Sequence, residues 1–578
     1  MSRPTPRYYI EISMTAFQQI ELQFKNHVLA DAEASMDLGA TDHLGQLGDP
    51  SLEALQARSD AAGQLLATLK QTEANDFDER LNLDLMKRYL QSDLFFDGLQ
   101  QHGELQRRRK PQGVDGISAG IFQLFVNDER DAQPRLDNIL SRLQQAPRYL
   151  AIETQVLTQP IARWRDIELE QGEGIADMLA TIVNWARQEH YPRLGDLEAA
   201  VSDCNCALNA YLTDLASRDV IANFALGEDK VRELLAIRQI KQSPAELATM
   251  ARDFMRETKV LLADLRSRLC NKYQLDSATT EVDLHEFLNE RFAAKVTEGQ
   301  LSSILDHYTD QAAAISQFIS DRDLFAVPDQ QNMRIMQTPG FLEPVIPAGA
   351  MWPPLALREG IKTSLVYLTL KEDQLAEHTS LGIPVMMIHE GIPGHHLQLA
   401  TAAQHPAFIR RIFNATEHAE GWTTMLEDYM LDVGYISDDL VDEVRFIAKR
   451  DISRLVARVG IDLYFMTDNK DYLDMGLGQS IDSQDVFENA ALLLKEATGF
   501  TDGRVQAELN WYSSEQGYPL SYLTGNRLVW QLKEDIQQAN TKKLDRTALD
   551  RAFHDVYLNS GCMPVESLRL VFAELGYL

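Results

Sequence analysis

Histidines are concentrated in one part of this sequence. Of the 13 histidines in the 578-residue chain, nearly half lie between positions 378 and 418. They are His378, His389, His395, His396, His405 and His418. Imidazole is the commonest protein ligand of transition metals, and its charge changes near neutral pH. This concentration therefore predicts a metal site or acid–base chemistry in the second half of the chain.

The segment GIPVMMIHEGIPGHHLQLA, residues 382–400, carries the most informative of these histidines. Pro384 fits the first turn of a helix, and the apolar residues 385–388 leave that helix no polar face. We therefore expect the helix to be buried on every side and to carry His389 and Glu390 into the interior. An ionisable pair without partners there costs several kcal/mol. A metal ion removes this cost, because it binds a neutral imidazole and a nearby carboxylate in a dry site.

The spacing of the histidines departs from the HExxH pattern of zinc peptidases, in which two imidazoles lie four residues apart on one helical face. Here the second histidine is His395, six residues after the first, or His396, seven residues after it. Six residues of straight helix turn by about 600° and rise about 9 Å, so the two rings would face different ways. Pro393 and Gly394 can break the helix and start a second one with His395 in its first turn. The spacing by itself leaves open both a metal site and two core histidines bonded to backbone carbonyls, and it favours a supporting or packing role for His396.

A candidate third ligand is Glu420, in the segment TEHAEGWTTMLEDYM. Zinc sites with a glutamate ligand take it from a downstream helix of this kind. An apolar stripe of the same helix, Trp422, Met425, Leu426 and Tyr429, lies nearly opposite Glu420 and Glu427. The two glutamates could therefore also form a solvated face, and the periodicity leaves both interpretations open.

The elements that must position these residues are mainly helices. Apolar residues recur at three- and four-residue spacing over most of the chain, and short turns separate the repeats. We predict helices over residues 17–32, 52–71, 77–99, 133–157, 174–191, 197–216, 243–273 and 300–319. A Pro- and Gly-rich stretch, residues 326–360, interrupts the pattern, and one strand is predicted at residues 363–370. We divide the chain there, into a helical N-terminal lobe (residues 1–325) and a half that carries the metal site (residues 326–578).

Composition and charge exclude several classes of function. The formal net charge of −31 repels phosphate backbones and anionic lipid, which argues against nucleic acid or a membrane as partner. No apolar run is long enough for a membrane span or a signal peptide, so we expect a cytoplasmic protein, or a periplasmic or lipoprotein form if an export signal has been removed. The four cysteines have no disulfide or metal spacing and are expected to be small buried residues.

The two motifs resemble segments of the bacterial family called domain of unknown function 885. Members carry an HEAYPGHHLQ-like segment followed by an EGWALYAE-like one; this chain has HEGIPGHHLQ at residues 389–398 and EGWTTMLE at residues 420–427. Weaker matches in the same order, from LGATDHLGQLGDPS to FHDVYLNSGCMPVESL, extend the resemblance over nearly the whole chain.

The family is in turn similar to helical gluzincin peptidases, whose two helical lobes enclose a deep cleft. The resemblance implies that one zinc ion is bound by His389, His395 and Glu420, that Glu390 is the general base, and that Glu427 supports the site. Two stretches depart from the family pattern. A DTGLH-like stretch is replaced around Arg458 and Asp462, and RYxxxPGQALSY by WYSSEQGYPLSY at residues 511–522. These departures concern substrate contacts rather than the metal.

The reaction that we expect is zinc-dependent hydrolysis of a peptide. Zinc would polarise the scissile carbonyl and lower the pKa of bound water toward about 7, and Glu390 would transfer the proton to the leaving amine. Tyr522 is the first candidate to stabilise the oxyanion. Further candidates for this role or for substrate contacts are Tyr518, Tyr512 and Arg454. The strand around Tyr367, if it is an edge strand, could pair with an extended peptide.

Two other functions remain open at this point. The site could hydrolyse a small non-peptide amide or an ester. Alternatively, the chain could be a helical binding protein or degenerate enzyme in which the histidines serve only the fold. The sequence contains no Walker loop or Gly-rich nucleotide fingerprint, so phosphate chemistry is not expected.

Overall fold

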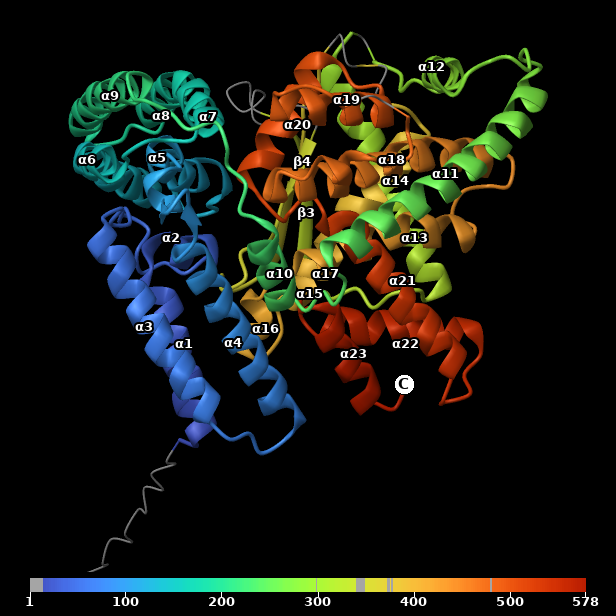
Figure 1. Cartoon of the computed structure of the whole chain (residues 1–578), viewed down its shortest axis with the longest axis horizontal. Helices are drawn as coiled ribbons and strands as arrows, with labels where there is room; N and C mark the ends of the chain where they lie inside the picture. The colour runs from blue at the N-terminus through green and yellow to red at the C-terminus, as the bar shows by residue number, and fades with distance from the viewer. Residues whose placement is uncertain (1–13, 298, 339–348, 372–374, 376–377, 479–480) are drawn as a thin grey trace, which may run out of the picture.

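The computed structural model describes residues 14–297, 299–338, 349–371, 375, 378–478 and 481–578, and it is mainly helical, as the sequence predicts (Figure 1). Residues 1–13 and part of the Pro- and Gly-rich stretch lie outside the described residues. Helices α1–α9 lie at the left of Figure 1, together with a short hairpin, β1–β2. From here on, the term N-terminal lobe means these elements. Their bounds are α1 Ala16–Ala30, α2 Ala32–Asp37, α3 Leu52–Gln71, α4 Phe77–Asp97, β1 Gln100–Gln101, β2 Glu104–Leu105, α5 Gly113–Phe122, α6 Ala132–Val156, α7 Ala162–Glu173, α8 Ile175–Gln188 and α9 Leu194–Ala216.

The remaining helices form a larger body at the right of Figure 1. They are α10 Glu228–Ile237, α11 Pro244–Tyr273, α12 Glu281–Arg291, α13 Ile304–Arg322, α14 Gly382–Glu390, α15 His395–Ala402, α16 Phe408–Ile412, α17 Thr416–Asp432, α18 Val441–Thr467, α19 Val486–Thr498, α20 Asp502–Ser514, α21 Ser521–Ala539, α22 Arg546–Asn559 and α23 Val565–Glu574. The helices predicted from periodicity are confirmed, and each begins and ends within four residues of its predicted bounds.

Local signals explain why these boundaries could be predicted. In α11 the hydroxyl of Ser243 accepts a hydrogen bond from the backbone N–H of Glu246, and the Glu246 carboxylate accepts one from the backbone N–H of Ser243. This capping box satisfies two backbone donors at the helix start, and Pro244 has no N–H to satisfy. The start of the helix is therefore specified by three side chains within four consecutive residues.

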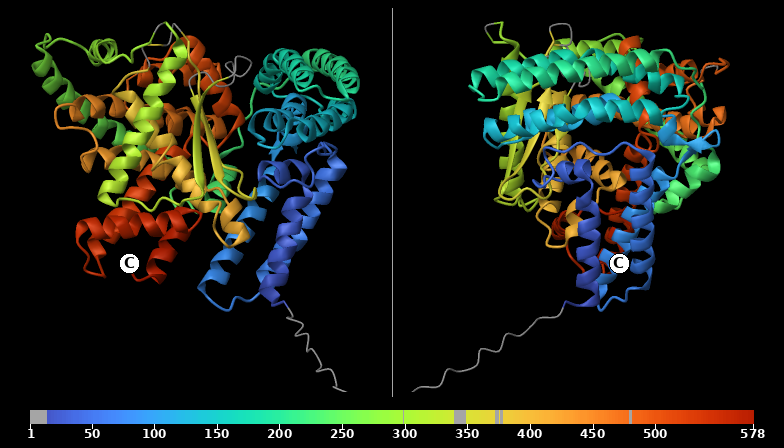
Figure 2. Two further views of the ribbon diagram at one scale, coloured as in Figure 1. Left: turned by 180° about the vertical axis from the view of Figure 1, so that it is seen from behind. Right: turned by 90° about the vertical axis from the view of Figure 1, so that its left-hand side faces the viewer.

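A three-stranded sheet stands between the N-terminal lobe and the larger body (Figure 2). Its strands are β3 Gln331–Gln337, β4 Gly349–Trp352 and β5 Lys362–Leu368, in the order β3-β5-β4. β5 is parallel to β3 and antiparallel to β4. The strand predicted at residues 363–370 is confirmed as β5, whereas β3 and β4 were not predicted, because their short, mixed sequences carry no clear alternation.

The expectation that the strand around Tyr367 is an edge strand is wrong. β5 is the central strand, so β3 and β4 take up its backbone hydrogen bonds and an added peptide cannot pair with it. The Tyr367 side chain is fully buried and packs with Leu365 among residues of the N-terminal lobe. Val366 and Leu368 point to the opposite face and join the core below α14 and α17. Tyr367 is thus a core residue between the N-terminal lobe and the larger body.

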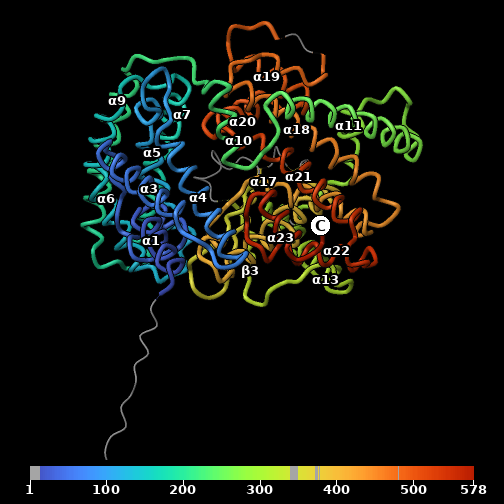
Figure 3. The backbone as a smooth tube through the Cα atoms, turned by 60° about the horizontal axis from the view of Figure 1, so that its bottom comes forward, coloured from blue at the N-terminus to red at the C-terminus, as the bar shows by residue number. Residues whose placement is uncertain are grey.

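Helices on either side of residue 325 pack together. α11 lies along α18, and α13 lies against α14. In Figure 3 the green helix α11 correspondingly crosses the orange helix α18. The division of the chain after residue 325 stays a prediction, as does the deep cleft implied by the resemblance to gluzincin peptidases.

Two further features bear on the sequence predictions. Within the described ranges, no helix combines the length and the hydropathy needed to cross a bilayer. The cysteines are free thiols; Cys204, Cys270 and Cys562 are buried as expected. Cys206 is exposed, because two residues along α9 from Cys204 the helix has turned by about 200°.

Candidate metal centre

The sequence GIPG separates the two helices that carry the histidines. α14 ends at Glu390, and α15 begins at His395. Gly394 comes so close to the first helix that a Cβ on it would lie 1.9 Å from the carbonyl oxygen of His389. Only glycine permits this approach. The chain therefore folds back, and the rings of His389 and His395 lie with their centroids 4.9 Å apart. The break predicted at Pro393 and Gly394 is confirmed.

Glu420 is carried by α17, a helix buried on nearly all sides. α21 packs closely against α17, since a Cβ on Gly421 would lie 2.5 Å from backbone atoms of Gly525. Glu420 is consequently only 4% exposed, and the Glu427 side chain is 15% exposed. The alternative that the two glutamates form a solvated face is wrong.

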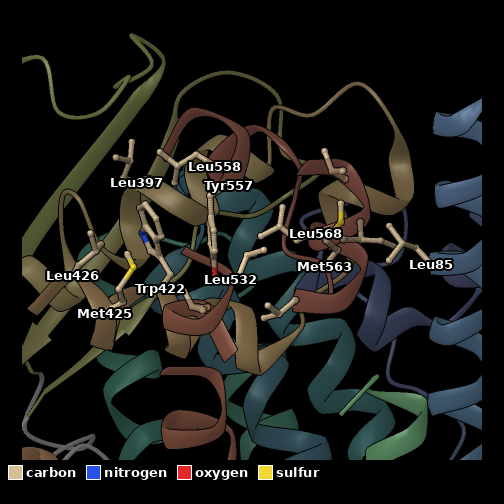
Figure 4. Packing of buried hydrophobic residues seen from close by; sticks show 14 of the residues in the cluster. Leu85, Leu397, Trp422, Met425, Leu426, Leu532, Tyr557, Leu558, Met563 and Leu568 are labelled. Carbon is tan, nitrogen blue, oxygen red and sulfur yellow. The ribbon is translucent and has the colours of Figure 1, made fainter. Parts of the chain in front are cut away.

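Trp422 ties α17 to the turn between α14 and α15. Its indole N–H donates a hydrogen bond of 2.9 Å to the carbonyl oxygen of Pro393. The indole ring stacks on Tyr557, with centroids 4.5 Å apart, inside a cluster that includes Leu397 and Met425 (Figure 4). The EGW motif thus combines a carboxylate, a glycine for close helix packing and a tryptophan that anchors the histidine turn.

His389, His395 and Glu420 converge, with one candidate ligand atom from each and all three atoms within 4.8 Å of one another. The Oε2 atom of Glu420 lies 3.4 Å from His395 Nε2 and 3.8 Å from His389 Nε2. Two atoms that bind zinc tetrahedrally at about 2.0–2.1 Å lie about 3.4 Å apart. Among the residues that the structure describes, no hydrogen bond of normal geometry reaches Oε2. The donor types, the spacing and this buried oxygen all fit a zinc ion.

Hydrogen bonds hold two of the three side chains from behind. His389 Nδ1 bonds to Glu427 Oε1 at 2.8 Å, so this nitrogen carries a proton and the other ring nitrogen, Nε2, faces Glu420. The hydroxyl of Tyr518 donates to Glu420 Oε1 at 3.0 Å, leaving Oε2 for the imidazoles. Carboxylates behind metal-binding histidines are typical of metal sites, so Glu427 lies where its predicted supporting role requires.

The electrostatics of the cluster favour a positive charge. Burial acts to lower the pKa of His389, but the hydrogen bond to Glu427 and the charges of Glu390, Glu427 and Glu420 raise it to about 9. Burial acts to raise the pKa of Glu420, yet the adjacent His395 and His389 hold it below its usual range. Burial also raises the pKa of Glu427, opposed by His389. The carboxylates therefore stabilise a cation at the imidazoles, whether a proton or a metal ion.

Glu390, the predicted base, follows His389 directly and is partly exposed. Its charge contributes to the raised pKa values of both His389 and Tyr522, so it lies near both residues. The His389 side chain is 17% exposed, which shows that water reaches the cluster. Glu390 is accordingly placed beside the candidate ligands without being one of them.

Tyr522, the first oxyanion candidate, lies on α21 next to Tyr518, with the ring centroids 5.8 Å apart. The guanidinium of Arg458 stacks on the Tyr522 ring at 4.3 Å. Burial, with a contribution from the charge of Glu420, raises the pKa of Tyr522, so the phenol keeps its proton and can donate it in a hydrogen bond. Arg454 lies one helical turn before Arg458, and its guanidinium is 3.3 Å from Asp451.

The other two tyrosine candidates already have partners. Tyr512 donates a hydrogen bond to Glu508 and accepts one from Arg458 Nε at 2.9 Å, so it belongs to a buried polar network. The Tyr518 hydroxyl donates a hydrogen bond to Glu420, which gives it a role in holding this candidate ligand. Its predicted substrate contact stays a prediction.

The other histidines between residues 378 and 418 that the structure describes in detail have partners away from this centre. His396 engages Ser364 on β5 at 2.7 Å through Nδ1 and Gln331 on β3 at 2.6 Å through Nε2. Burial lowers its pKa to about 4, and both nitrogens are occupied, so His396 links α15 to the sheet. His378 bonds to Tyr308, and His418 bonds to the carbonyl oxygen of Met563. Only one of the two adjacent histidines, His395, therefore faces Glu420.

Sequence reasoning did not foresee the contacts of two residues near the centre, one of which, Asp462, it named only as a departure from the family pattern. Asp462 on α18 accepts hydrogen bonds from the backbone N–H groups of Gly517 and Leu520, at 2.9 and 3.0 Å. Arg238, at the end of α10, donates to the carbonyl oxygen of Gly517. Their partners are backbone groups far along the chain, and no residue pattern reports such contacts. Gly421 and Gly525, both small residues within helices, were the available signal that α17 and α21 touch.

Comparisons with known proteins agree on family and fold. The chain is similar to the structure of a protein from Shewanella oneidensis described as a lipoprotein of unknown function, with TM-score 0.75, 16% identity, and 97% of this chain and 100% of that chain covered. It is equally similar to a protein from Colwellia psychrerythraea described as a lipoprotein, with TM-score 0.75, 17% identity, and 97% and 99% covered.

No curated protein matches the sequence. A family model described as "bacterial protein of unknown function (DUF885)" matches residues 33–571, which is nearly the whole chain and includes both the PGHH and EGW motifs. The chain belongs to the DUF885 family.

Proposed function

We propose that this protein is a zinc-dependent hydrolase that cleaves peptides. The observation that carries the proposal is the convergence of His389, His395 and Glu420, with Oε2 of Glu420 buried and facing both imidazoles. Residues brought together from three helices, α14, α15 and α17, at the spacing of a tetrahedral ion, are hard to explain as core histidines. His389 and His395 lack the backbone carbonyl partners that such a core role would require, within the part of the chain that is described.

His389, His395 and Glu420 would hold the zinc ion, which would supply a Lewis acid that polarises the substrate carbonyl and activates water near neutral pH. The carboxylate of Glu390 accepts the proton of the attacking water and passes it to the leaving nitrogen. The phenol of Tyr522 donates a hydrogen bond to the carbonyl oxygen as negative charge develops. Glu427 and Tyr518 keep His389 and Glu420 in place during this transfer.

An extended peptide would pair with the sheet along β4 rather than β5. β4 is an edge strand of the described sheet, and Gly349 in it lies against Met386 of α14, the helix that carries His389. Strand addition supplies affinity through main-chain hydrogen bonds without selecting a particular side chain. This arrangement supports a peptide substrate over a compact non-peptide amide.

The cellular location is part of the proposal. Both structural neighbours are described as lipoproteins, which favours an exported or lipid-anchored form over the cytoplasmic location expected from the sequence. Fractionation of cells that express the natural gene, with detection of the protein in membrane, periplasmic and cytoplasmic fractions, decides between these locations.

The metal is tested by elemental analysis of protein purified without added zinc. We expect about one zinc per chain in the parent protein and almost none in His389→Ala. His405→Ala is the matched control, because His405 is a half-buried histidine outside the cluster and its loss should leave the metal in place. A parent protein without metal, whose stability is unchanged by His389→Ala, would instead indicate a binding protein.

The reaction is tested with a panel of peptides, acyl amides and esters, using Glu390→Gln as the inactive control. Turnover of peptides that is lost in Glu390→Gln supports the proposal. Turnover restricted to non-peptide amides or esters would replace the peptidase assignment by a different hydrolase.

A further inference from the structure

The turn between α20 and α21 reaches the metal centre through one side chain. This turn, residues 515–520, carries Tyr518, whose hydroxyl donates a hydrogen bond to Glu420 Oε1. A carboxylate with one oxygen held in this way is oriented so that the other oxygen, Oε2, is turned toward the imidazoles. The position of the Tyr518 backbone therefore helps to set which oxygen of Glu420 faces them.

Asp462 holds this turn from both sides of Tyr518. Its Oδ1 accepts a hydrogen bond from the N–H of Gly517, and its Oδ2 accepts one from the N–H of Leu520. Asp462 is fully buried on α18. Only a carboxylate presents two acceptor oxygens to two N–H donors, because an amide would turn its NH₂ group toward one of them. The residue type thus matches the backbone of the turn.

Arg238 connects the same turn to the helix that carries Glu420. Its guanidinium donates to the carbonyl oxygen of Gly517 and forms an ion pair of 2.5 Å with Glu417, three residues before Glu420 on α17. α10, α17 and α21 lie close to one another in both Figure 1 and Figure 3. Gly517 is held between these groups with φ +86°, and a Cβ on it would lie 2.8 Å from Leu234.

We propose that Asp462 is a positioning residue of the metal centre, which acts through the 515–520 turn and Tyr518 to direct Oε2 of Glu420 at the two imidazoles. The inference rests on the proposed function, because it concerns affinity for the proposed metal ion. Asp462 does not touch the ligands itself, so its effect on the metal passes entirely through Tyr518.

The test is zinc affinity, measured by competition with a chromophoric chelator at constant pH. Removing supporting groups behind metal ligands weakens binding by about 10–100-fold. We expect Tyr518→Phe to weaken zinc binding within this range and Asp462→Asn to weaken it by a similar or smaller factor. The combined variant should bind no more weakly than Tyr518→Phe alone, because both changes break the same connection.

Glu168→Gln is the matched control. Glu168 is a buried carboxylate of the N-terminal lobe that accepts hydrogen bonds from the N–H of Val114 and the hydroxyl of Tyr211. Its substitution should disturb folding as much as Asp462→Asn does but leave zinc affinity unchanged. If Asp462→Asn does not fold, Arg238→Lys tests the turn from the other side. It keeps the charge facing Glu417 and removes the hydrogen bond to Gly517.

The outcomes separate this inference from the proposed function. Zinc affinity that is unaltered by Asp462→Asn, or losses from Asp462→Asn and Tyr518→Phe that multiply in the combined variant, overturn the positioning role while the metal site stands. Losses that do not multiply, with no change in Glu168→Gln, support it. A parent protein that binds no zinc overturns the proposed function and this inference with it.

Discussion

Two buried glutamates in this protein have similar surroundings and opposite electrostatics. Glu168 in the N-terminal lobe and Glu420 in the larger body are 3% and 4% exposed, and each accepts a hydrogen bond from a tyrosine, Tyr211 and Tyr518 respectively. Burial raises the pKa of Glu168 to about 7. The pKa of Glu420, by contrast, is held below its usual range by His395 and His389.

The difference lies in the partners of the two carboxylates. Oε1 of Glu168 accepts hydrogen bonds from both the Tyr211 hydroxyl and the backbone N–H of Val114, which are neutral donors. Among the described residues, the groups that face Oε2 of Glu420 are two imidazole nitrogens, at distances longer than ordinary hydrogen bonds. Burial alone favours a neutral acid. A carboxylate that stays ionised in the interior, opposite two imidazoles, is what a bound cation requires.

The largest effect should come from removing the charge of Glu420. In Glu420→Gln we expect zinc content to fall from about one per chain to almost none, because an amide oxygen is a far poorer zinc ligand than a carboxylate. Glu168→Gln should retain the full zinc content. Elemental analysis of both variants, purified side by side, measures the difference in zinc content. Equal zinc in both variants would contradict the role of Glu420 as a ligand.

The next effect concerns catalysis without loss of metal. Glu390→Gln should reduce turnover of a peptide substrate by about 10²–10⁴-fold, the usual contribution of a general base. Zinc content should remain that of the parent protein, because Glu390 lies beside the ligands and is not one of them. Steady-state rates and elemental analysis on the same preparation provide the two measurements. Loss of zinc from Glu390→Gln would indicate that Glu390 is a metal ligand rather than the general base.

A smaller effect is expected at the carboxylate behind His389. Glu427→Gln should weaken zinc binding by about 10–100-fold, since an amide aligns the imidazole less strongly than a carboxylate does. Competition with a chelator gives the affinity. Asp428→Asn is the neighbouring control, because Asp428 pairs with Lys449 rather than with a ligand. A change of equal size in both variants would show that α17 is merely disturbed.

The smallest effect is a pH dependence of the N-terminal lobe. Because the pKa of Glu168 rises from 4.5 to about 7 on folding, the folded protein binds this proton more tightly than the unfolded chain. The stabilisation is present below pH 4.5 and is lost as the pH rises through about 7. Glu168→Gln should lack this part of the dependence. Thermal midpoints at pH 5 and pH 8 should reveal a difference of a few degrees between parent and variant.

Much of the fold could be predicted from local patterns. The long helices follow from three- and four-residue spacing, and β5 follows from a short run of β-branched and aromatic residues. β4 was missed because Gly349–Trp352 has no pattern of its own and pairs only because β5 lies beside it. For the same reason, the edge position assigned to β5 was wrong: the order of strands depends on segments that sequence periodicity does not connect.

The candidate ligands were identified from their types and from the family resemblance, yet their geometry was not. The spacing of His389 and His395 left two core histidines equally possible. On a straight helix, the six-residue spacing would turn the two rings away from each other. The close approach of Gly394 to the carbonyl oxygen of His389 folds the chain back, so that the two rings face the same site. His396 could be separated from His395 only once its two nitrogens were found bonded to β5 and β3.

The sequence by itself determined the helical class, the family and the chemical types gathered around residues 389–427, because these depend on neighbouring residues along the chain. Only the tertiary structure decided that Glu420 is buried, that Tyr518 binds it and that Asp462 holds Tyr518. The hydrogen bonds among them join residues 55 or more positions apart, and they form only when α17, α18 and α21 pack together. The burial that makes each contact strong is a property of that packing and not of any single segment.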